Sequence, residues 1–341
     1  MPTITYADLL RVTQEIIEAA GTARENALGI GEALVEANLR GHDSHGVLRL
    51  PWYIQAIERG EISATALPEV IARRGATAQV DGKFGWGQLA ARLATKTAIE
   101  LAGEYNIGLV GIVRGQHIGR VGEYVETIAN AGMIGIAFCN AGAAVAPYGG
   151  YERLLGTNPL AWAVPRGNGQ PPMVLDFATS IVAEGKLRVT RSKGEMLAHD
   201  GLIYDTTGKP SIDPADFYEG GALRTFGLHK GSGLSVMIEL LARGLCGVDP
   251  TLEGPNGHNG TLIIAFQIPA FAPTEQFESA VSRFQAQVDG MKPLEGVERI
   301  LMPGDPELIS RENRLRDGIP LPQSLWDELS ELAARYNVSF V

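Results

Sequence analysis

The sequence predicts a mixed α/β (α+β) fold with a helical part contributed by both ends of the chain. Apolar residues recur at helical spacing at the N-terminal end, strand-like runs alternate with helical ones from about residue 69, and helical spacing returns near the C-terminus. The length of 341 residues suggests about two domains. We expect a helical domain from residues 1–68 and 305–341, and a mixed α/β domain over 69–304 with a small subdomain around 185–225.

The N-terminal part contains three predicted helices. Thr5 can cap the first, whose apolar residues repeat at helical spacing until Gly21 ends it. A second helix runs to Arg40. A third starts near Pro51, which the first turn of a helix tolerates, and ends before Gly60.

Strand-like and helical runs alternate through the middle of the sequence. The predicted strands are VIARRG, TAQVDG, IGLVGIV, MIGIAFCN, NPLAWAVP and PMVLDFA. The predicted helices between them are GQLAARLATKTAIELAGEY and VGEYVETIANAG. The polar, turn-rich segment from Arg188 to Gly220 is expected to form loops over one face.

The C-terminal part mixes helices with one strand. A helix is expected from Ser232 to Leu245, followed by a strand at GTLIIAFQI. Two more helices are expected at PTEQFESAVSRFQAQV and PQSLWDELSELAARY, and the second can pack back on the N-terminal helices. The MPGDPE and GTNP segments are expected to be loops, and composition does not assign them a role.

Composition excludes several classes of partner. A net charge of -10 and the absence of a long run of Lys and Arg argue against nucleic acid. No window approaches the 18 uninterrupted apolar residues of a membrane span, and the N-terminal segment lacks a signal-peptide pattern, so we expect a cytoplasmic protein. Cys139 and Cys246 are too few for a disulfide framework and are expected to be reduced, buried thiols.

One glycine pattern imitates a dinucleotide-binding fingerprint without its context. Gly85, Gly87 and Ala90 give G-x-G-x-x-A between a strand-like and a helical run. In a Rossmann unit, an acidic residue about 20 positions later ends the next strand and holds the ribose. Here that strand is followed by Arg114, and the nearest acid, Glu104, precedes the strand. We therefore predict a structural turn and helix start at these glycines.

The stretch RGHDSHGVLRL gathers several reactive side chains. His42 and His45 are three residues apart, a spacing that suits a metal ion if further ligands join them, and Asp43 lies between them. Nothing nearby completes such a shell. A packed or capping role for His42 explains it at least as well as a functional one.

His45, Arg49 and Tyr53 form a second pattern within this region. Their spacing of four residues projects all three side chains to one side if the chain turns helically, although Pro51 favours leaving His45 in the preceding loop. A histidine that titrates near neutral pH, next to an arginine that binds a carboxylate, is what reduction of a 2-oxo acid requires. A salt bridge from Arg49 to a surface acid explains the pattern as simply.

Three further residues carry candidate chemistry. His117 lies between a strand end and a helix start, where it can serve an anion site or merely cap the turn. Asp176 interrupts an apolar strand, so its carboxylate needs a partner, for which a histidine is an economical choice. Lys230 lies in the turn GLHKGSG before a helix, which suits phosphate binding although the P-loop pattern is absent.

Six segments taken in order resemble one known family. They are GHDSHGVLRLPWY, APYGG, LLGTNPLAWAVP, VLDFATS, GLHKGSGLSVMIELL and PGDPE. Together they are similar to the type-2 malate/L-lactate dehydrogenases, a family that includes ureidoglycolate dehydrogenases, diketogulonate reductases, sulfolactate dehydrogenases and cyclic imine reductases. The match runs from about Leu39 to Glu307. The resemblance implies a non-Rossmann fold, a mixed-sheet domain that binds NADH or NADPH, and a homodimer.

The resemblance also implies roles for individual residues. His45 corresponds to the proton donor in reduction, Arg49 to the carboxylate anchor, and His117 to a histidine with a catalytic role in the ureidoglycolate branch. Tyr53 and Thr157 are expected substrate contacts. Asp176 is expected to be catalytic by orienting or charge-coupling a histidine. The segments that match cofactor contacts contain Val174, Asp176, Phe177, Ala178, Thr179, Ser180, His229, Lys230, Gly304, Asp305 and Pro306.

The sequence departs from parts of the family pattern. The Ser-Asp pair of the ureidoglycolate branch falls on Ala141 and Gly142, which makes ureidoglycolate an unexpected substrate. Many relatives carry an asparagine-histidine-phenylalanine run where this chain reads GQHIGRVGEY, which leaves the role of His117 open. The small, apolar NAGAAVA loop would leave room for a larger or less polar side chain on the substrate, such as an aromatic one.

We therefore expect an NAD(P)H-dependent oxidoreductase that interconverts small 2-oxo carboxylates and L-2-hydroxy acids without a metal. An alternative within the class is reduction of a cyclic imine carboxylate. Alternatives of other classes are a metal-dependent hydrolase or lyase using His42, Asp43 and His45, and a nucleotide-binding scaffold. NAD and NADP are not distinguished, because the basic side chains after DFATS can either accept a ribose 2'-phosphate or form a solvated loop. They are Arg188, Arg191 and Lys193.

Overall fold

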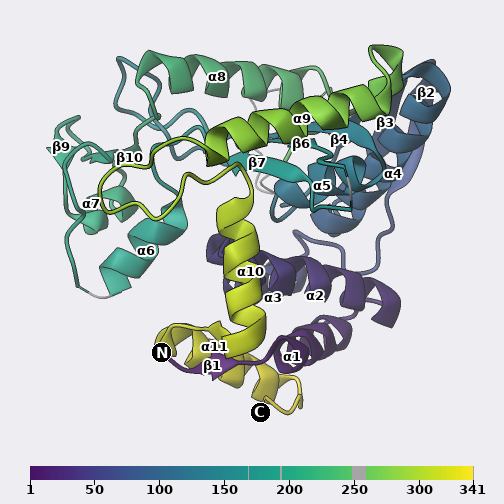
Figure 1. The fold of residues 1–341 in the computed structure, drawn as a ribbon. Helices are drawn as coiled ribbons and strands as arrows, with labels where there is room; N and C mark the ends of the chain where they lie inside the picture. The colour runs from purple at the N-terminus through teal and green to yellow at the C-terminus, as the bar shows by residue number, and fades with distance from the viewer. Residues whose placement is uncertain (168, 193, 248–258, 341) are drawn as a thin grey trace.

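Helices from both ends of the chain pack around one apolar core (Figure 1). The computed structural model describes residues 1–167, 169–192, 194–247 and 259–340. The helices of this core are α1 (Tyr6–Ala19), α2 (Arg24–Leu39), α3 (Leu50–Glu58) and α11 (Gln323–Arg335). The short strands β1 (Thr3–Ile4) and β12 (Ile319–Pro320) pair antiparallel and tie the two chain ends together. The four predicted helices are thus confirmed, with Thr5 capping α1 through the N–H of Asp8.

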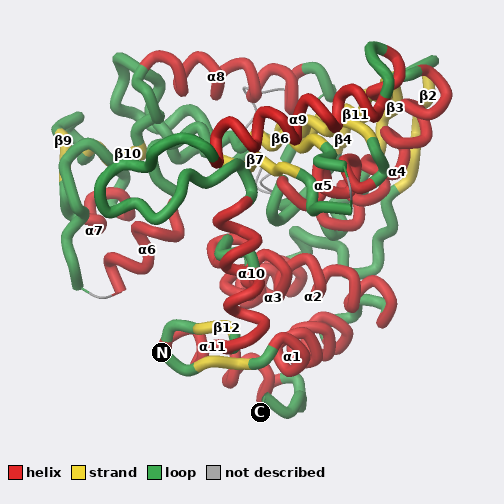
Figure 2. The backbone as a smooth tube through the Cα atoms, in the orientation of Figure 1, coloured by secondary structure: helices red, strands yellow, loops and turns green. Residues whose placement is uncertain are grey.

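A seven-stranded sheet forms the second core of the molecule (Figure 2). Its strands are β2 (Glu69–Arg74), β3 (Thr77–Asp81), β4 (Ile107–Val113), β5 (Met133–Cys139), β6 (Leu160–Val164), β7 (Met173–Phe177) and β11 (Thr261–Gln267). Their order is β2-β3-β4-β11-β5-β6-β7, and β3 with β4 is the parallel pair in an otherwise antiparallel sheet. This arrangement confirms a mixed α/β fold that differs from the parallel Rossmann sheet.

Two helices cover one face of this sheet. They are α4 (Gly87–Tyr105) and α5 (Gly122–Asn130), and α4 packs closely because its inner side is lined by buried alanines. A Cβ at Gly108 of β4 would lie 2.2 Å from the carbonyl oxygen of Ala98, so only glycine lets the helix approach this strand. The close packing fixes the ends of α4 and β4, where the residues described below lie.

The opposite face of the sheet carries an apolar row across five strands. Register places Leu109, Ile264, Ile136, Trp162 and Leu175 directly beside one another, from β4 to β7. Trp162 is 45% exposed, and its neighbours in the row are half-buried. A continuous apolar surface that is left partly open is unusual for an isolated chain.

The segment from Arg188 to Gly220 was expected to form loops, and that prediction is wrong. The region around it, between β7 and α8, forms regular elements. It contains two helices, α6 (Glu184–Ser192) and α7 (Pro214–Tyr218), and a three-stranded sheet of β8 (Ile203–Tyr204), β9 (Pro210–Ser211) and β10 (Ala222–Leu223). Buried apolar residues such as Leu187, Ile203 and Phe217 form its core. The elements are so short that their turn residues conceal the periodicity.

The remaining helices are α8 (His229–Glu239), α9 (Thr274–Asp289) and α10 (Asp305–Asp317). α8 begins three residues before the predicted start and continues as a π-helix over Leu240–Gly244. α10 begins within the MPGDPE segment that was expected to be a loop, with Gly304 in the left-handed region at φ 94° before it. Within the described residues, no helix is long and apolar enough to cross a membrane.

Candidate active site

The stretch before α3 brings His45 and Arg49 together without forming an α-helix. It contains two 3-10 turns, Asp43–His45 and Val47–Arg49, so His45 lies in the turn region that Pro51 favours. The Oδ1 of Asn38 accepts a hydrogen bond from the N–H of Val47 at 2.8 Å and holds the second turn against α2. Arg49 donates from Nε to the carbonyl of Ser44 at 2.8 Å, which fixes the guanidinium beside the His45 segment.

The fold then adds His117 to this pair. The imidazole rings of His45 and His117 are stacked, with centroids 5.6 Å apart and planes 10° from parallel. The hydroxyl of Tyr53 lies 2.6 Å from Nδ1 of His117, and Gln88 donates from Nε2 to that hydroxyl at 2.8 Å. The five side chains brought together here thus come from three separate segments of sequence: the 45–53 region, the start of α4, and the loop after β4.

The glycine pattern at the start of α4 has a structural role in this arrangement. A Cβ at Gly87 would lie 2.3 Å from the carbonyl oxygens of both Gln116 and His117. Glycine therefore lets the loop that carries His117 approach the first turn of α4, where Gln88 reaches Tyr53. The prediction that these residues form a turn and a helix start is confirmed.

Both histidines lie in an environment that disfavours their protonated form. Burial, followed by the charges of Arg49, His42 and Arg120, lowers the pKa of His45 to about 3. Burial, Arg49 and His45 likewise hold the pKa of His117 well below its usual value. Burial raises the pKa of the Tyr53 hydroxyl, so it stays protonated and able to donate. The site therefore begins with two neutral imidazoles that each keep part of their surface exposed.

Asp176 has a different partner from the one expected. Its Oδ2 accepts a hydrogen bond from the N–H of Gly122 at 2.7 Å, at the start of α5, and its charge acts on the nearby Arg120. The prediction of a histidine partner for Asp176 is therefore wrong. The N-terminal end of α5 and the buried Arg120 stabilise this carboxylate instead. Arg120 in turn contributes to the lowered pKa of His45.

The possible metal ligands of the RGHDSHG stretch have separate partners. His42 contacts Glu307 at 3.3 Å, whereas Asp43 pairs with Arg314 of α10 and accepts from Asn38. His45 faces Ser44 and His117. In the part of the chain that the structure describes, no three His, Cys, Asp or Glu side chains are grouped to hold a metal ion. The geometry thus does not supply the ligand set that the hydrolase or lyase alternative needs.

The expected cofactor segments meet along β7, the edge strand of the large sheet. The carbonyl of Pro303 accepts from the N–H of Val174 at 3.2 Å, and a Cβ at Gly304 would lie 3.1 Å from the same nitrogen. Thr179 donates to the carbonyl of Thr157 at 2.8 Å, and its own carbonyl accepts from Phe226 at 3.1 Å. Through these bonds, the predicted residues 174–180 lie beside residues 304–306. Phe226, which bonds to Thr179, comes three residues before the start of α8 at His229 and Lys230.

This assembly fits a dinucleotide. The first turns of α8 and α10 receive no side-chain cap, and the positive end of each helix dipole favours a phosphate group nearby. Lys230 is exposed in the first turn of α8, where its charge would support the same anion. The ring of Phe177, at the end of β7, packs edge-on against the ring of Phe226, with the two centroids 5.6 Å apart. This contact holds the segment before α8 against β7. Thr157 lies at this assembly through its backbone.

The basic residues after DFATS have partners within their own segment. Arg188 lies 3.2 Å from Glu184, and the guanidinium of Arg191 lies over the ring of Tyr218 at 4.5 Å. Lys193 lies outside the described residues. Glu184 also faces Arg49, since its Oε2 is 3.8 Å from Nη2 of that residue.

Sequence reasoning did not identify three residues of this site: Gln88, Arg120 and Glu184. Gln88 and Arg120 lie within quoted motifs, and both are almost fully buried, but burial of a polar side chain is visible only in the fold. Glu184 follows DFATS by a few residues and begins a helix that was not predicted from the sequence.

Comparison with known proteins identifies the family. A family model described as malate/L-lactate dehydrogenase matches residues 4–330. The chain belongs to the malate/L-lactate dehydrogenase family. A malate dehydrogenase of Pyrococcus abyssi is 35% identical over 97% of this chain and 94% of its own. A Delta(1)-pyrroline-2-carboxylate/Delta(1)-piperideine-2-carboxylate reductase of Pseudomonas syringae is 31% identical over 97% of this chain and 96% of its own.

The solved structures agree. A malate dehydrogenase from Entamoeba histolytica superposes with a TM-score of 0.93 at 29% identity, over 99% of both chains. As a member of the malate/L-lactate dehydrogenase family, the chain is an oxidoreductase of the class that interconverts 2-hydroxy and 2-oxo acids and uses a nicotinamide cofactor. The expectation from the six motifs is confirmed at this level.

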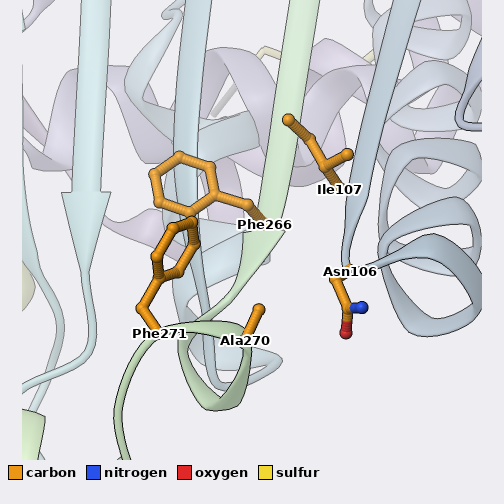
Figure 3. A pocket seen from close by; sticks show the side chains of 5 residues that line it. All are labelled: Asn106, Ile107, Phe266, Ala270 and Phe271. Atoms are coloured by element: carbon orange, nitrogen blue, oxygen red, sulfur yellow. The ribbon is translucent and has the colours of Figure 1, made fainter.

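An apolar pocket elsewhere in this dehydrogenase lies away from the histidines. Figure 3 shows its lining of Asn106, Ile107, Phe266, Ala270 and Phe271. It opens where β4 begins and β11 ends, whereas His117 follows the other end of β4. Phe271 is 83% exposed, so this pocket is a shallow surface feature and separate from the candidate active site.

Proposed function

We propose that this protein reduces 2-oxo carboxylates to L-2-hydroxy acids with NADH or NADPH, and catalyses the reverse oxidation. The observation that carries the proposal is the stacked pair His45 and His117 beside Arg49, in a site with no metal-type ligand cluster among the described residues. Carbonyl reduction requires a proton donor, a group that polarises the oxygen and an anchor for the carboxylate. These three side chains can supply one function each.

The hydrogen bonds around Tyr53 suggest how the two histidines divide the work. Because Gln88 donates to the Tyr53 hydroxyl, the single hydroxyl proton of Tyr53 is free to be donated to Nδ1 of His117. A neutral His117 then carries its proton on Nε2, where it can donate a hydrogen bond to the carbonyl oxygen without giving up the proton. His45 is left as the residue that transfers the proton itself.

Arg49 is the proposed anchor for the substrate carboxylate. Its Nε donates to the Ser44 carbonyl, its Nη2 lies 3.8 Å from Glu184, and its charge acts on both histidines. Binding of a carboxylate there would offset the positive charge that helps lower the pKa of His45, so substrate binding would favour protonation of that imidazole. The anchor and the acid are therefore coupled through charge as well as through position.

The cofactor is proposed to lie along β7 and the first turns of α8 and α10. Residues 174–180 would provide backbone contacts, His229 and Lys230 would lie at the phosphates, and Gly304, Asp305 and Pro306 would border the same strand. When bound, the nicotinamide supplies the hydride. Tyr53 and Thr157 are the remaining residues proposed to act on the substrate. Tyr53 would act indirectly, through its hydrogen bond to His117.

We also propose a homodimer in the cytoplasm. The half-exposed apolar row through Ile136 and Trp162 supports a partner of the same kind on that face of the sheet. Light scattering should give twice the chain mass, and Trp162→Glu should give the monomer mass, because the charge would lie in the interface. The two buried free cysteines support a reducing compartment.

The experiment that tests the function uses chelator-treated protein with NADH or NADPH and a panel of 2-oxo acids and cyclic imines. We expect oxidation of the reduced nicotinamide that depends on a 2-oxo acid, with the L-2-hydroxy acid as product, and the two rates rank the cofactors. Oxidation with cyclic imines alone would favour the alternative that the P. syringae relative suggests. Binding of cofactor without oxidation by any substrate would overturn the substrate class.

A further inference from the structure

A resident carboxylate lies beside the anchor arginine. Oε2 of Glu184, at the start of α6, is 3.8 Å from Nη2 of Arg49, and both side chains are only about a fifth to a quarter exposed. The other oxygen of the same carboxylate accepts a hydrogen bond from the Tyr218 hydroxyl at 2.8 Å and lies 3.2 Å from Nη2 of Arg188. Glu184 is thus an anion at the site where substrate is proposed to place its own anion.

The position of Glu184 is fixed by the backbone as well as by these bonds. A Cβ at the neighbouring Gly185 would lie 2.6 Å from Cβ of Ser44, so the start of α6 rests directly on the turn that carries His45. Burial, together with Glu184 itself, raises the pKa of Tyr218 to about 12, so that hydroxyl continues to donate to the carboxylate. Glu184 is therefore held in place rather than free to swing away.

The charges at this point match one substrate carboxylate. Arg49, Arg188 and Glu184 together carry a net charge of +1, and the two histidines are neutral, as described above. A single carboxylate on the substrate neutralises this cluster. A second carboxylate would bring an unbalanced negative charge toward Glu184, and charge repulsion in a partly buried site is stronger than in water.

We propose that Glu184 is a specificity-determining residue that favours 2-oxo acids with one carboxylate over those with two. The proposal rests on the proposed function and deepens it by naming the substrate class. The same carboxylate also limits how Arg49 is used, because one side of its guanidinium already faces an anion and the remaining donors suit one carboxylate.

The test compares wild type with Glu184→Gln, which removes the charge and keeps an oxygen that can accept from Tyr218. The two substrates are 2-oxobutanoate and oxaloacetate, which have the same number of carbons and differ in the second carboxylate. We expect wild type to favour 2-oxobutanoate in kcat/KM, and Glu184→Gln to raise the ratio of oxaloacetate to 2-oxobutanoate by about tenfold. The change should lie in the KM for oxaloacetate, with kcat nearly constant.

Glu195→Gln is the matched control, because Glu195 is an exposed acid in the same segment and the substitution makes the same change in net charge. It should leave the ratio unchanged. A wild type that prefers oxaloacetate, an equal effect of Glu184→Gln on both substrates, or the same change in Glu195→Gln would each overturn the proposal. A wild type that reduces no 2-oxo acid at all would overturn the proposed function, and this inference with it.

A measurement on wild type alone covers the case in which Glu184→Gln fails to fold. Raising the salt concentration to about 0.3 M shortens the screening length to about 6 Å, which weakens repulsion between the second carboxylate and Glu184. The ratio of kcat/KM for oxaloacetate to that for 2-oxobutanoate should therefore rise with salt. A ratio that is constant or falls with salt contradicts the proposal.

Discussion

The imidazole rings of His45 and His117 are stacked 5.6 Å apart, almost parallel and on different segments of the chain. Two imidazoles this close cannot both be protonated at low cost, because each charge raises the energy of the other. The site therefore holds at most one added proton at a time. A reaction that moves one proton, with the second ring acting as a hydrogen-bond donor, suits this arrangement.

Replacing His45 should reduce turnover without weakening cofactor binding. In His45→Gln the proton carrier is lost, so we expect kcat to fall by about 10²–10⁴ while the Kd for NADH or NADPH changes little. Steady-state rates and cofactor fluorescence titration measure the two quantities. A variant that loses cofactor affinity and turnover equally would show that His45 has no specific role in proton transfer.

Arg49→Ala should act mainly on substrate binding. Loss of a charge-assisted carboxylate contact should raise the KM for 2-oxo acids by about 100-fold, with a smaller effect on kcat. Arg59→Ala is a matched control, since Arg59 lies at the other end of α3 and pairs with Glu61 at the surface. If both variants raise KM alike, Arg49 is not the anchor.

Tyr53→Phe should disturb the orientation of His117. The substitution removes the hydroxyl between Gln88 and His117, so His117 can change tautomer and Gln88 loses a buried partner. We expect kcat to fall by roughly tenfold and the free energy of unfolding to fall by about 1–3 kcal/mol. Urea unfolding and kinetics give both values. Unchanged kcat in a destabilised Tyr53→Phe would mean that the chain from Gln88 to His117 supports only the fold.

Stability should decrease as the pH falls below the ordinary histidine range. The pKa of His45 is about 3 in the folded protein and near the ordinary histidine value of 6.5 in the unfolded chain. Below about pH 6.5 the unfolded chain therefore binds a proton that the native site does not. The contribution of neutral His45 to the free energy of unfolding is fully present above pH 6.5. It is lost as the pH falls toward 3, at up to about 1.4 kcal/mol per pH unit. In His45→Asn this part of the slope should disappear. Urea unfolding between pH 7 and 4 checks it, and equal slopes would contradict the burial argument.

The sequence predicted long, periodic elements well because their burial pattern is local. The helices at both chain ends and the strands of the large sheet follow directly from spacing of apolar residues, as does the proximity of His45 and Arg49. The structure around Glu184 could not be predicted in this way, because its short helices and two-residue strands obtain their stability from a shared core. The spacing of apolar residues within a short segment does not indicate such contacts.

The errors at single residues have the same origin. A buried carboxylate at Asp176 correctly predicts a partner, but the identity of that partner depends on which strand pairs with β7 and on where α5 begins. Gly87, by contrast, was correctly predicted to have a structural role, but only the fold shows that this role is to let the loop of His117 approach α4. Sequence spacing can indicate that a residue has a structural or functional role, but the tertiary fold determines which contacts it makes and so what that role is.

The most direct test of the central claim follows the hydride itself. Wild-type protein is mixed with nicotinamide cofactor deuterated at both C4 positions of the reduced ring and with a 2-oxo acid, and the product is analysed by NMR. The account predicts deuterium at C2 of an L-2-hydroxy acid, in proportion to the cofactor consumed, and a much slower appearance of the same label in His45→Gln. Consumption of cofactor without deuterium at C2, or label that appears equally fast in His45→Gln, would contradict it.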